Sequence, residues 1–286
     1  MPPRKPSPVG AHVPVSGGLV KALAYAREIG AGAVQVFVSN PRGWKPSAGD
    51  PEQDAAFARG CGDAGLPVFV HAPYLVNFGS PTAATLSRSV EAVQHALGRA
   101  QAIGARGVVV HAGSAVACAH RDEAMAQLRS HLLPILRAAD PDGPRLLVEP
   151  TAGGGEALAA TVQALGPWFD ELDAHPLLGV CLDTCHAYAA GHDVAQPGGM
   201  KRALDALVRT VGRGRLALVH ANDSKDPLGS TRDRHEAIGQ GHIGKDGFAE
   251  LFRHPATRGV PVVIETPGDA AAHRRDVELL CALRDS

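Results

Sequence analysis

Six short apolar segments of the chain each end in a histidine or an acidic residue. The segments are VFV, VVV, LLV, VCL, ALV and VVI, and the residues that end them are His71, His111, Glu149, Asp183, His220 and Glu265. Chance explains six such endings in a row poorly, at about one in 10⁵ for this composition. Imidazole and carboxylate groups bind divalent cations, and carboxylates held close together repel one another unless cations lie between them. If the six ends converge, the sequence predicts a metal centre.

Two local motifs supply three further candidate ligands. In CLDTCHAYAAGHD, His186 follows Asp183 by three residues, after a turn that can fold it back. In STRDRHEAIGQGHIG, Asp233 and His235 are two residues apart, so an extended loop points both the same way. The nine candidates suit about three ions, with water completing each shell. Their mixture of nitrogen and oxygen favours Zn²⁺, with Mn²⁺ and Fe²⁺ as alternatives, over Mg²⁺ and Ca²⁺.

The elements that must position these residues are alternating strands and helices. The six segments read as buried parallel strands, and VGAHV and AVQVFV complete a set that ends near residues 12, 37, 71, 111, 149, 183, 220 and 265. Helical segments include LVKALAYAREIG, a long one from Ser80-Pro81 to Gly104, KDGFAELFRHP and AAHRRDVELLCALRD. Eight such units predict an α/β fold, a single (β/α)8 TIM barrel, and no Gly-x-Gly-x-x-Gly supports a doubly wound sheet. In a barrel the carboxyl ends of the strands meet at one mouth, where active sites form.

Composition narrows the class of protein. The chain has 286 residues, a formal net charge of −1 and 45% apolar residues, which excludes a disordered chain and a protein that coats nucleic acid by bulk charge. We expect residues 1–8 to form a disordered tail and residues 9–286 the catalytic barrel. An odd number of cysteines, five, indicates free thiols in a reducing compartment, and no apolar run is long enough to span a membrane. The sequence therefore predicts a cytoplasmic protein without a membrane partner.

The segments CLDTCHAYAAGHD, HANDSKDPLGSTRDRHEAIGQGHIG and VEPTAGGG resemble the endonuclease IV type of apurinic/apyrimidinic endonuclease, AP endonuclease family 2. The resemblance runs from GAHVPVSGG near residue 10 to VVIETPG near residue 265. It implies a (β/α)8 barrel with three zinc ions that hydrolyses double-stranded DNA 5′ to an abasic site, in base excision repair. The products are then a 3′-hydroxyl and a 5′-deoxyribose phosphate, and blocked 3′ ends are trimmed as well.

The resemblance also implies roles for single residues. All nine candidate ligands fall on the family's metal-ligand positions. Glu149 would bridge two ions and count as the catalytic residue; His71 and His111 would complete one shell, Asp183, His220 and Glu265 another, and His186, Asp233 and His235 the third. Two positions depart from the family pattern, because Pro150 replaces an expected Asn and Ala112 an expected Pro. Neither is a ligand, so we expect effects on ligand support and rate rather than on reaction type.

The loops after the second and third strands are the expected DNA contacts. They read SNPRGWKPS and HAPYLVNFGS, and cationic and aromatic side chains on them could enter the DNA stack and hold a flipped abasic nucleotide. The resemblance assigns this role to Arg42, Tyr74 and Leu75. A site that must straddle a duplex leaves one barrel face open, so we expect a monomer.

Several alternatives remain open on the residues alone. We expect His12 to support a neighbouring side chain, and Cys181 and Cys185 to be packing residues rather than ligands. Gly239, Gly241 and Gly244 fit a phosphate cradle and a plain turn equally well. A metal-dependent sugar isomerase or epimerase is the alternative enzyme, although it would leave His186, Asp233 and His235 without a role. A metal-stabilised barrel that only binds damaged DNA needs the same ring of ligands.

Overall fold

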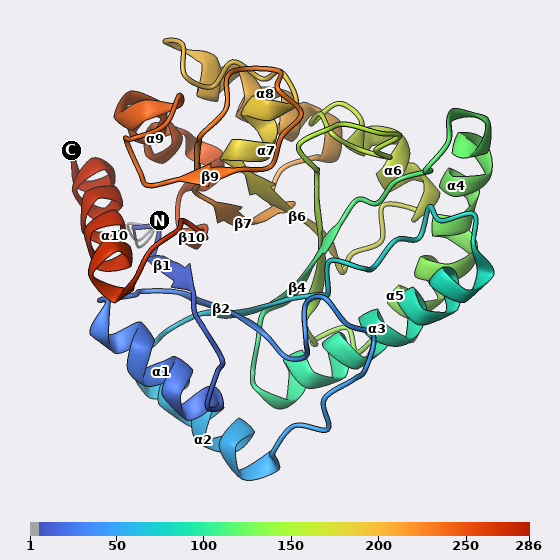
Figure 1. The fold of residues 1–286 in the computed structure, drawn as a ribbon, viewed down its shortest axis with the longest axis horizontal. Coiled ribbons are helices and arrows are strands. Elements are labelled where there is room, and N and C mark those ends of the chain that lie inside the picture. Colours follow the sequence, from blue (N-terminus) through green and yellow to red (C-terminus); the bar gives the residue numbers. More distant parts are fainter. Residues whose placement is uncertain (1–5) are drawn as a thin grey trace.

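Eight parallel strands close into a barrel in the computed structural model, which describes residues 6–286. Their order around the barrel is β1-β10-β7-β6-β5-β4-β3-β2, and helices surround them (Figure 1). The barrel strands are β1 (Val9–His12), β2 (Val34–Phe37), β3 (Val68–His71), β4 (Gly107–His111), β5 (Arg145–Glu149), β6 (Leu178–Asp183), β7 (Leu216–His220) and β10 (Val262–Ile264). The predicted (β/α)8 barrel is confirmed, and each predicted strand end lies within one residue of the observed one.

The helices follow the strands in sequence, and more than one helix fills some connections. They are α1 (Leu19–Glu28), α2 (Pro51–Asp63), α3 (Ala83–Ala102), α4 (Arg121–Gln127), α5 (Leu133–Ala138), α6 (Leu165–Glu171), α7 (Thr184–Ala189), α8 (Gly199–Val211), α9 (Gly244–Arg253) and α10 (Ala270–Asp285). A two-stranded antiparallel pair, β8 (Asp223–Ser224) and β9 (His235–Glu236), lies in the connection after β7. The long predicted helix begins at Ala83, two residues after the expected Ser80-Pro81, with Thr82 at its N-cap.

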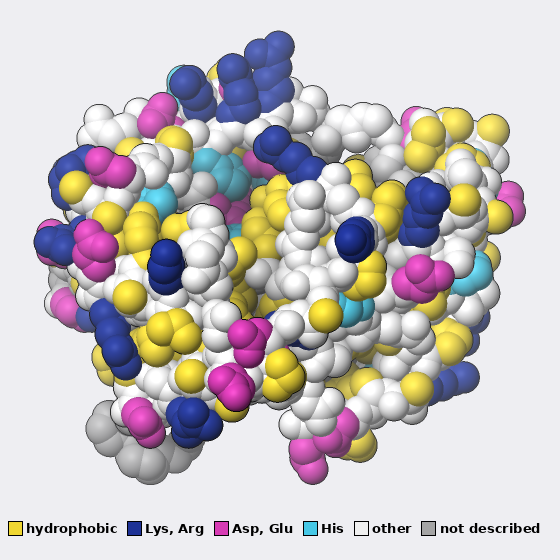
Figure 2. All heavy atoms as spheres, turned by 60° about the horizontal axis from the view of Figure 1, so that its bottom comes forward, with side chains coloured by type: hydrophobic (Ala, Val, Ile, Leu, Met, Phe, Trp, Pro, Cys, Tyr) yellow, Lys and Arg dark blue, Asp and Glu magenta, His cyan; other side chains and the backbone are white. Residues whose placement is uncertain are grey.

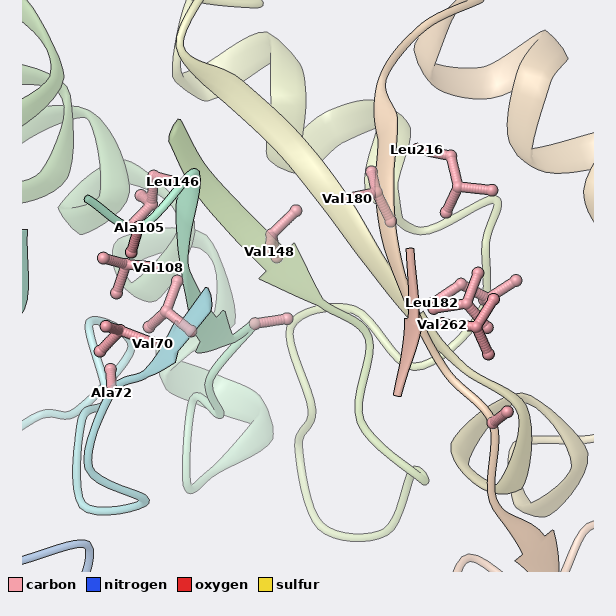
Figure 3. Packing of buried hydrophobic residues seen from close by; sticks show 14 of the residues in the cluster. Val70, Ala72, Ala105, Val108, Leu146, Val148, Val180, Leu182, Leu216 and Val262 are labelled. Carbon is pink, nitrogen blue, oxygen red and sulfur yellow. The ribbon is translucent and has the colours of Figure 1, made fainter. Parts of the chain in front are cut away.

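The two faces of the strands bury different sets of side chains. Outward-facing residues such as Val70, Val108, Leu146 and Val180 belong to the large core between strands and helices (Figure 3). A separate inner cluster fills the barrel itself and consists of Ala33, Phe69, Val109, Leu147, Cys181, Leu218 and Val263. Because side chains alternate along a strand, the residue two positions later lies on the same inner face, one level closer to the mouth. For the seven members of the inner cluster, these residues are Gln35, His71, His111, Glu149, Asp183, His220 and Glu265.

The N-terminal segment is ordered earlier than predicted. Ser7 is buried; its hydroxyl donates to the Thr257 carbonyl at 2.6 Å and accepts from the Gly259 N–H at 3.1 Å. The Arg284 guanidinium donates to the Ser7 carbonyl at 3.0 Å. We expected residues 1–8 to form a disordered tail. This expectation is wrong for Ser7, because these hydrogen bonds hold Ser7 on the barrel; residues 1–5 lie outside the described residues. In residues 6–286, no helix has both the length and the apolar character needed to cross a membrane.

Candidate metal centre

The six strand-end residues converge at the carboxyl end of the barrel, as the topology requires. Glu149, Asp183, His220 and His71 are buried, while His111 and Glu265 remain partly open to solvent. Figure 2 shows a hollow in the surface in which histidine and acidic side chains are visible, with lysine and arginine side chains beside it. The centre is thus a lined depression that solvent and a ligand can reach.

His71, His111 and Glu149 form the first group able to hold a cation, with donor atoms all within 4.8 Å of one another. The Glu149 Oε2 atom lies 3.4 Å from His71 Nε2 and 3.6 Å from His111 Nε2. Among residues 6–286, this buried oxygen has no hydrogen-bond partner. Leaving a buried carboxylate oxygen unpaired costs on the order of 1–3 kcal/mol or more, and a cation at this point removes that cost.

Asp183, His220 and Glu265 form a second group. His220 Nδ1 lies 3.4 Å from Glu265 Oε2 and 3.9 Å from Asp183 Oδ2. The same nitrogen lies 3.0 Å from Glu149 Oε1, so the two Glu149 oxygens face different groups. Glu149 therefore lies where a bridging ligand would be.

The third group joins the barrel to its loops. Asp183, His186 and His235 lie within 4.8 Å of one another, and Asp233 contributes an oxygen 3.2 Å from His186 Nε2 and another 2.9 Å from His235 Nε2. Asp183 caps α7 by accepting the His186 N–H at 2.8 Å, which folds His186 back over the strand end as predicted. The β8–β9 pair brings His235 to the mouth, and the segment around it runs beside α7 (Figure 1). Asp183 thus belongs to two groups, which the sequence did not predict.

Charges in the centre are set by burial and by neighbours together. Burial would raise the pKa of Glu149, but His220, His71 and His186 outweigh it and hold that pKa well below its usual range. Burial lowers the pKa of His111 to about 4. Burial also opposes charge on His235, but Asp233 and Asp183 outweigh it and raise its pKa to about 9. Glu149 is therefore ionised and His111 neutral at pH 7, as metal binding requires.

Backbone carbonyls orient three of the imidazoles. The Nδ1 atoms of His71, His186 and His235 lie 2.7, 3.0 and 3.1 Å from the carbonyl oxygens of Ala72, Pro150 and Glu265, respectively. Each Nδ1–H can donate to its carbonyl, which leaves the Nε2 lone pair facing the groups described above.

The two departures from the family pattern fall on backbone contacts. Pro150 supplies the carbonyl that faces His186, and Ala112 supplies the carbonyl that accepts from Trp168 Nε1 at 3.1 Å. Every residue type has this carbonyl. Both hydrogen bonds are therefore present with the substituted residues.

Three polar residues outside the nine contact them. His12, which we expected to support a neighbour, has its Nδ1 2.8 Å from Glu265 Oε1. Asn222 donates to Asp183 Oδ2 at 2.7 Å and accepts the Glu265 N–H at 2.7 Å. Gln35 contacts both Glu265 and His220. Asn222 and Gln35 were not predicted from the sequence. Gln35 could have been found, because it is the one polar residue of the apolar run AVQVFV and faces inward, where a polar side chain needs a partner.

The turn that contains Gly239, Gly241 and Gly244 encloses a carboxylate of the protein itself. From the sequence, this turn fitted a phosphate cradle and a plain turn equally well. The buried Asp223 accepts the N–H groups of Gly239 at 2.8 Å, Ile243 at 2.8 Å and Gly244 at 3.3 Å. At Gly241, a Cβ atom would lie 2.5 Å from Asp223 Oδ1, so this position admits only glycine. The N–H groups that would bind a phosphate are therefore already used by Asp223, so the turn is not a phosphate-binding site.

The two cysteines near the centre are buried thiols. Burial raises the pKa of Cys181 to about 12 and also raises the pKa of Cys185. Cys181 packs in the inner cluster, although its sulfur also lies within reach of Glu149 and His220, and that of Cys185 within reach of Asp233 and His235. Protonated thiols are poor ligands, so these positions agree with the expected packing role.

The three expected DNA contacts lie on neighbouring loops at the mouth. Tyr74 is 46% exposed, and its ring stacks on His111 with centroids 5.7 Å apart. Leu75 is 37% exposed, and the Tyr74 N–H donates to the Pro41 carbonyl, which holds the two loops together beside Arg42. Within residues 6–286, the Arg42 guanidinium makes no hydrogen bond or ion pair. All three side chains are thus free to contact a ligand at the mouth.

Comparisons with known proteins agree with this geometry. A family model described as a xylose isomerase-like TIM barrel, AP endonuclease 2, matches residues 23–283. A probable endonuclease 4 of Streptomyces avermitilis is 58% identical over 98% of this chain and 91% of its own length. The crystal structure of endonuclease IV from Thermus thermophilus is 35% identical with a TM-score of 0.85, over 99% of both chains.

A sugar-epimerase structure is also similar, but at lower identity. A D-tagatose 3-epimerase-like protein has a TM-score of 0.75 and 19% identity over 97% of both chains, which shows a common fold alone. The identity to the endonuclease 4 relatives extends over nearly the whole chain, and the expected resemblance is confirmed. The chain belongs to the endonuclease 4 family of enzymes.

Proposed function

We propose that this enzyme is a zinc-dependent endonuclease that hydrolyses double-stranded DNA 5′ to an abasic site. The products would be a 3′-hydroxyl and a 5′-deoxyribose phosphate, and blocked 3′ ends would be trimmed at the same site. The observation that carries the proposal is the convergence of five imidazoles and four carboxylates in three groups around Glu149. A sugar isomerase on a similar barrel would have no use for the Asp233–His235 pair and His186.

Each group would hold one ion. The ligand sets are His71, His111 and Glu149; Asp183, His220 and Glu265; and His186, Asp233 and His235. Zn²⁺ fits this donor set best, because imidazole nitrogen dominates and the nearby thiols are protonated. Bound divalent cations would supply hydroxide at neutral pH and neutralise the phosphodiester.

The chain's own residues set the remaining conditions. Glu149, ionised and in contact with two groups, would hold their ions at a fixed separation rather than transfer a proton. Burial, with Glu265 and Glu149 nearby, raises the pKa of Tyr74 to about 12, so its hydroxyl remains a donor. Arg42 would contact a backbone phosphate, and Tyr74 and Leu75 would occupy the space of the missing base. A site that straddles a duplex leaves one barrel face open, so the enzyme would act as a monomer. Its five free thiols suit the reducing cytoplasm.

A cleavage assay tests the proposal. A labelled duplex with one tetrahydrofuran abasic site is incubated with protein whose metal content is known from mass spectrometry. We expect incision 5′ to the lesion by protein carrying about three zinc ions, a product end that a polymerase extends, and loss of incision in Glu149→Gln and in His220→Ala. Glu278→Gln, an equal charge change to Glu149→Gln but on the exposed face of α10, is the matched control. An intact duplex after incubation with fully metal-loaded protein would refute the proposed nuclease activity. Phosphorylated sugars would then be the next substrates to test.

A further inference from the structure

Gln35 is a fully buried amide within the barrel mouth. It lies on β2, two residues after Ala33 of the inner cluster, so its side chain shares the level of the strand-end ligands. Its Nε2 lies 2.8 Å from Glu265 Oε1 and 2.9 Å from His12 Nδ1. Its Oε1 lies 2.9 Å from His220 Nε2. The amide therefore joins two members of one ligand group without being a member itself.

The orientation of the amide follows from its neighbours. Glu265 belongs to a group that could hold a cation, and a carboxylate that binds a cation is ionised. An ionised carboxylate only accepts hydrogen bonds, so the amide nitrogen must face Glu265 and the amide oxygen must face His220. That oxygen can accept only from an N–H. His220 Nδ1 lies 3.0 Å from Glu149 Oε1 and also faces Asp183 and Glu265. When His220 is neutral, as a metal ligand must be, its proton therefore stays on Nε2 and the Nδ1 lone pair is the donor to a cation.

The same amide also determines which Glu265 oxygen is free. Oε1 is engaged by Gln35 Nε2 and His12 Nδ1, both at 2.8 Å. Oε2 lies instead 3.4 Å from His220 Nδ1, on the side of the ligand group. The Gln35 side chain thus sets both the tautomer of His220 and the oxygen of Glu265 that is free to bind a cation.

His220 differs in this respect from the other oriented imidazoles. His71, His186 and His235 face backbone carbonyls, which no substitution removes. His220 depends on a side chain 185 residues away in sequence. Its tautomer is therefore the one that a single substitution can release.

We propose that Gln35 is a positioning residue for the ion held by Asp183, His220 and Glu265, acting through the His220 tautomer and the free oxygen of Glu265. The inference rests on the proposed function only in that the centre binds divalent cations. Without the amide, the buried Nε2–H of His220 loses its acceptor, and the tautomer with the proton on Nδ1 directs that proton at the ion. Loss of such an outer contact typically weakens metal binding about 10- to 100-fold.

The test measures metal binding, not cleavage. Wild-type protein, Gln35→Met and the exposed-surface control Gln94→Met are loaded with Zn²⁺ and titrated with a chromophoric chelator. We expect Gln35→Met to lose one ion about 10- to 100-fold more readily, with the other two retained, and Gln94→Met to match the wild type. Equal loss of every ion, or no change in any, would overturn the proposal.

A spectroscopic measurement separates positioning from simple loss of packing. Long-range ¹H–¹⁵N correlation spectra of the zinc-loaded protein report which ring nitrogen of His220 carries the proton. We expect Nε2–H in the wild type and its loss or mixing with the other tautomer in Gln35→Met. An unchanged tautomer in Gln35→Met would contradict the assigned role.

Gln35→Glu is a second variant of equal size. It keeps an oxygen for His220 Nε2–H but places an oxygen against Glu265, so we expect the tautomer to be kept and ion binding still to weaken. Displacement of the Nε2 proton in this variant would oppose the proposal. If the wild type binds its ions but leaves abasic DNA intact, the nuclease proposal fails and the role of Gln35 stands; if it binds no ion, both fail.

Discussion

The strand-borne ligands and the loop-borne pair, Asp233 and His235, hold the same kinds of donor atoms by different means. Glu149 and His220 are almost fully buried, whereas the Asp233 side chain is 51% exposed. Barrel register fixes the strand ends, so their separation is a property of the sheet. The loop-borne pair depends on a connection that buried Asp223 and the Asp226–Arg234 ion pair hold in shape. The barrel thus provides rigid candidate ligands, and a side-chain network adds further candidates that can be lost separately.

The largest effect is expected at Glu149, the strand-borne carboxylate that lies among four imidazoles. Glu149→Gln keeps the shape of the side chain but removes the charge that lies among His71, His111, His220 and His186. We expect incision to fall by about a thousandfold or more and at least one ion to be lost. Single-turnover cleavage and metal analysis measure both. Retention of full metal content and rate would mean that the strand-borne ligands do not act as a unit.

Asp223→Ala should disturb the loop that carries Asp233 and His235 and leave the strand-borne residues in place. The backbone N–H groups of Gly239, Ile243 and Gly244 lose their acceptor. We expect the free energy of unfolding to fall by about 2–4 kcal/mol, and the third ion to be lost while two remain. Urea unfolding, hydrogen exchange of residues 237–244 and metal stoichiometry test this. The exposed Asp246→Ala is the control, and simultaneous loss of all three ions would argue against independent parts.

Lowering the pH should weaken metal binding at the loop-borne group and at the His71–His111–Glu149 group at different pH values, because their histidines differ in pKa. His111 is already neutral at pH 7 because burial holds its pKa at about 4, whereas the pKa of His235 is about 9 despite burial, because Asp233 and Asp183 favour its charge. A proton must leave His235 before a metal binds, so the affinity of the loop-borne group should rise with pH up to about 9.

Metal analysis after dialysis at stepped pH values measures this difference. We expect the third ion to leave before the ion held by His71, His111 and Glu149 as the pH is lowered from about 8 to about 6, at up to tenfold in affinity per unit for one displaced proton. First loss from the His71–His111–Glu149 group would contradict the assignment of charges.

Arg42→Ala should give the smallest effect, because this side chain contacts neither kind of ligand. We expect KM for abasic duplex to rise by about tenfold with kcat little changed, and the slope of log affinity against log salt to fall by about one. Binding by fluorescence anisotropy at several salt concentrations measures the slope, and steady-state cleavage measures KM and kcat. The loop residue Lys45, changed to Ala, is the comparison. An unchanged salt slope would remove Arg42 from the phosphate contacts.

The sequence predicted most of the barrel and the nine residues brought together at its mouth, because both follow from a local pattern. A strand that ends in His, Asp or Glu carries its ligand candidate in its own few residues. Gln35, Asn222 and Asp223 were not predicted, since each acts through contacts with residues distant in sequence. The order at Ser7 was missed for the same reason: its partners are Thr257, Gly259 and Arg284.

The two-residue step from the inner cluster to the ligand ring has a consequence for how this protein can change. A single residue inserted or deleted within a barrel strand exchanges an inward candidate ligand for an apolar side chain that had faced the helices. It therefore places a hydrophobic side chain in the mouth and removes a candidate metal donor at the same time. The loops after the strands carry no such constraint, because their length does not enter the strand register. Loop grafting on β2 and β3 can therefore redirect the enzyme toward other substrates, while the strands tolerate substitutions but not shifts in length.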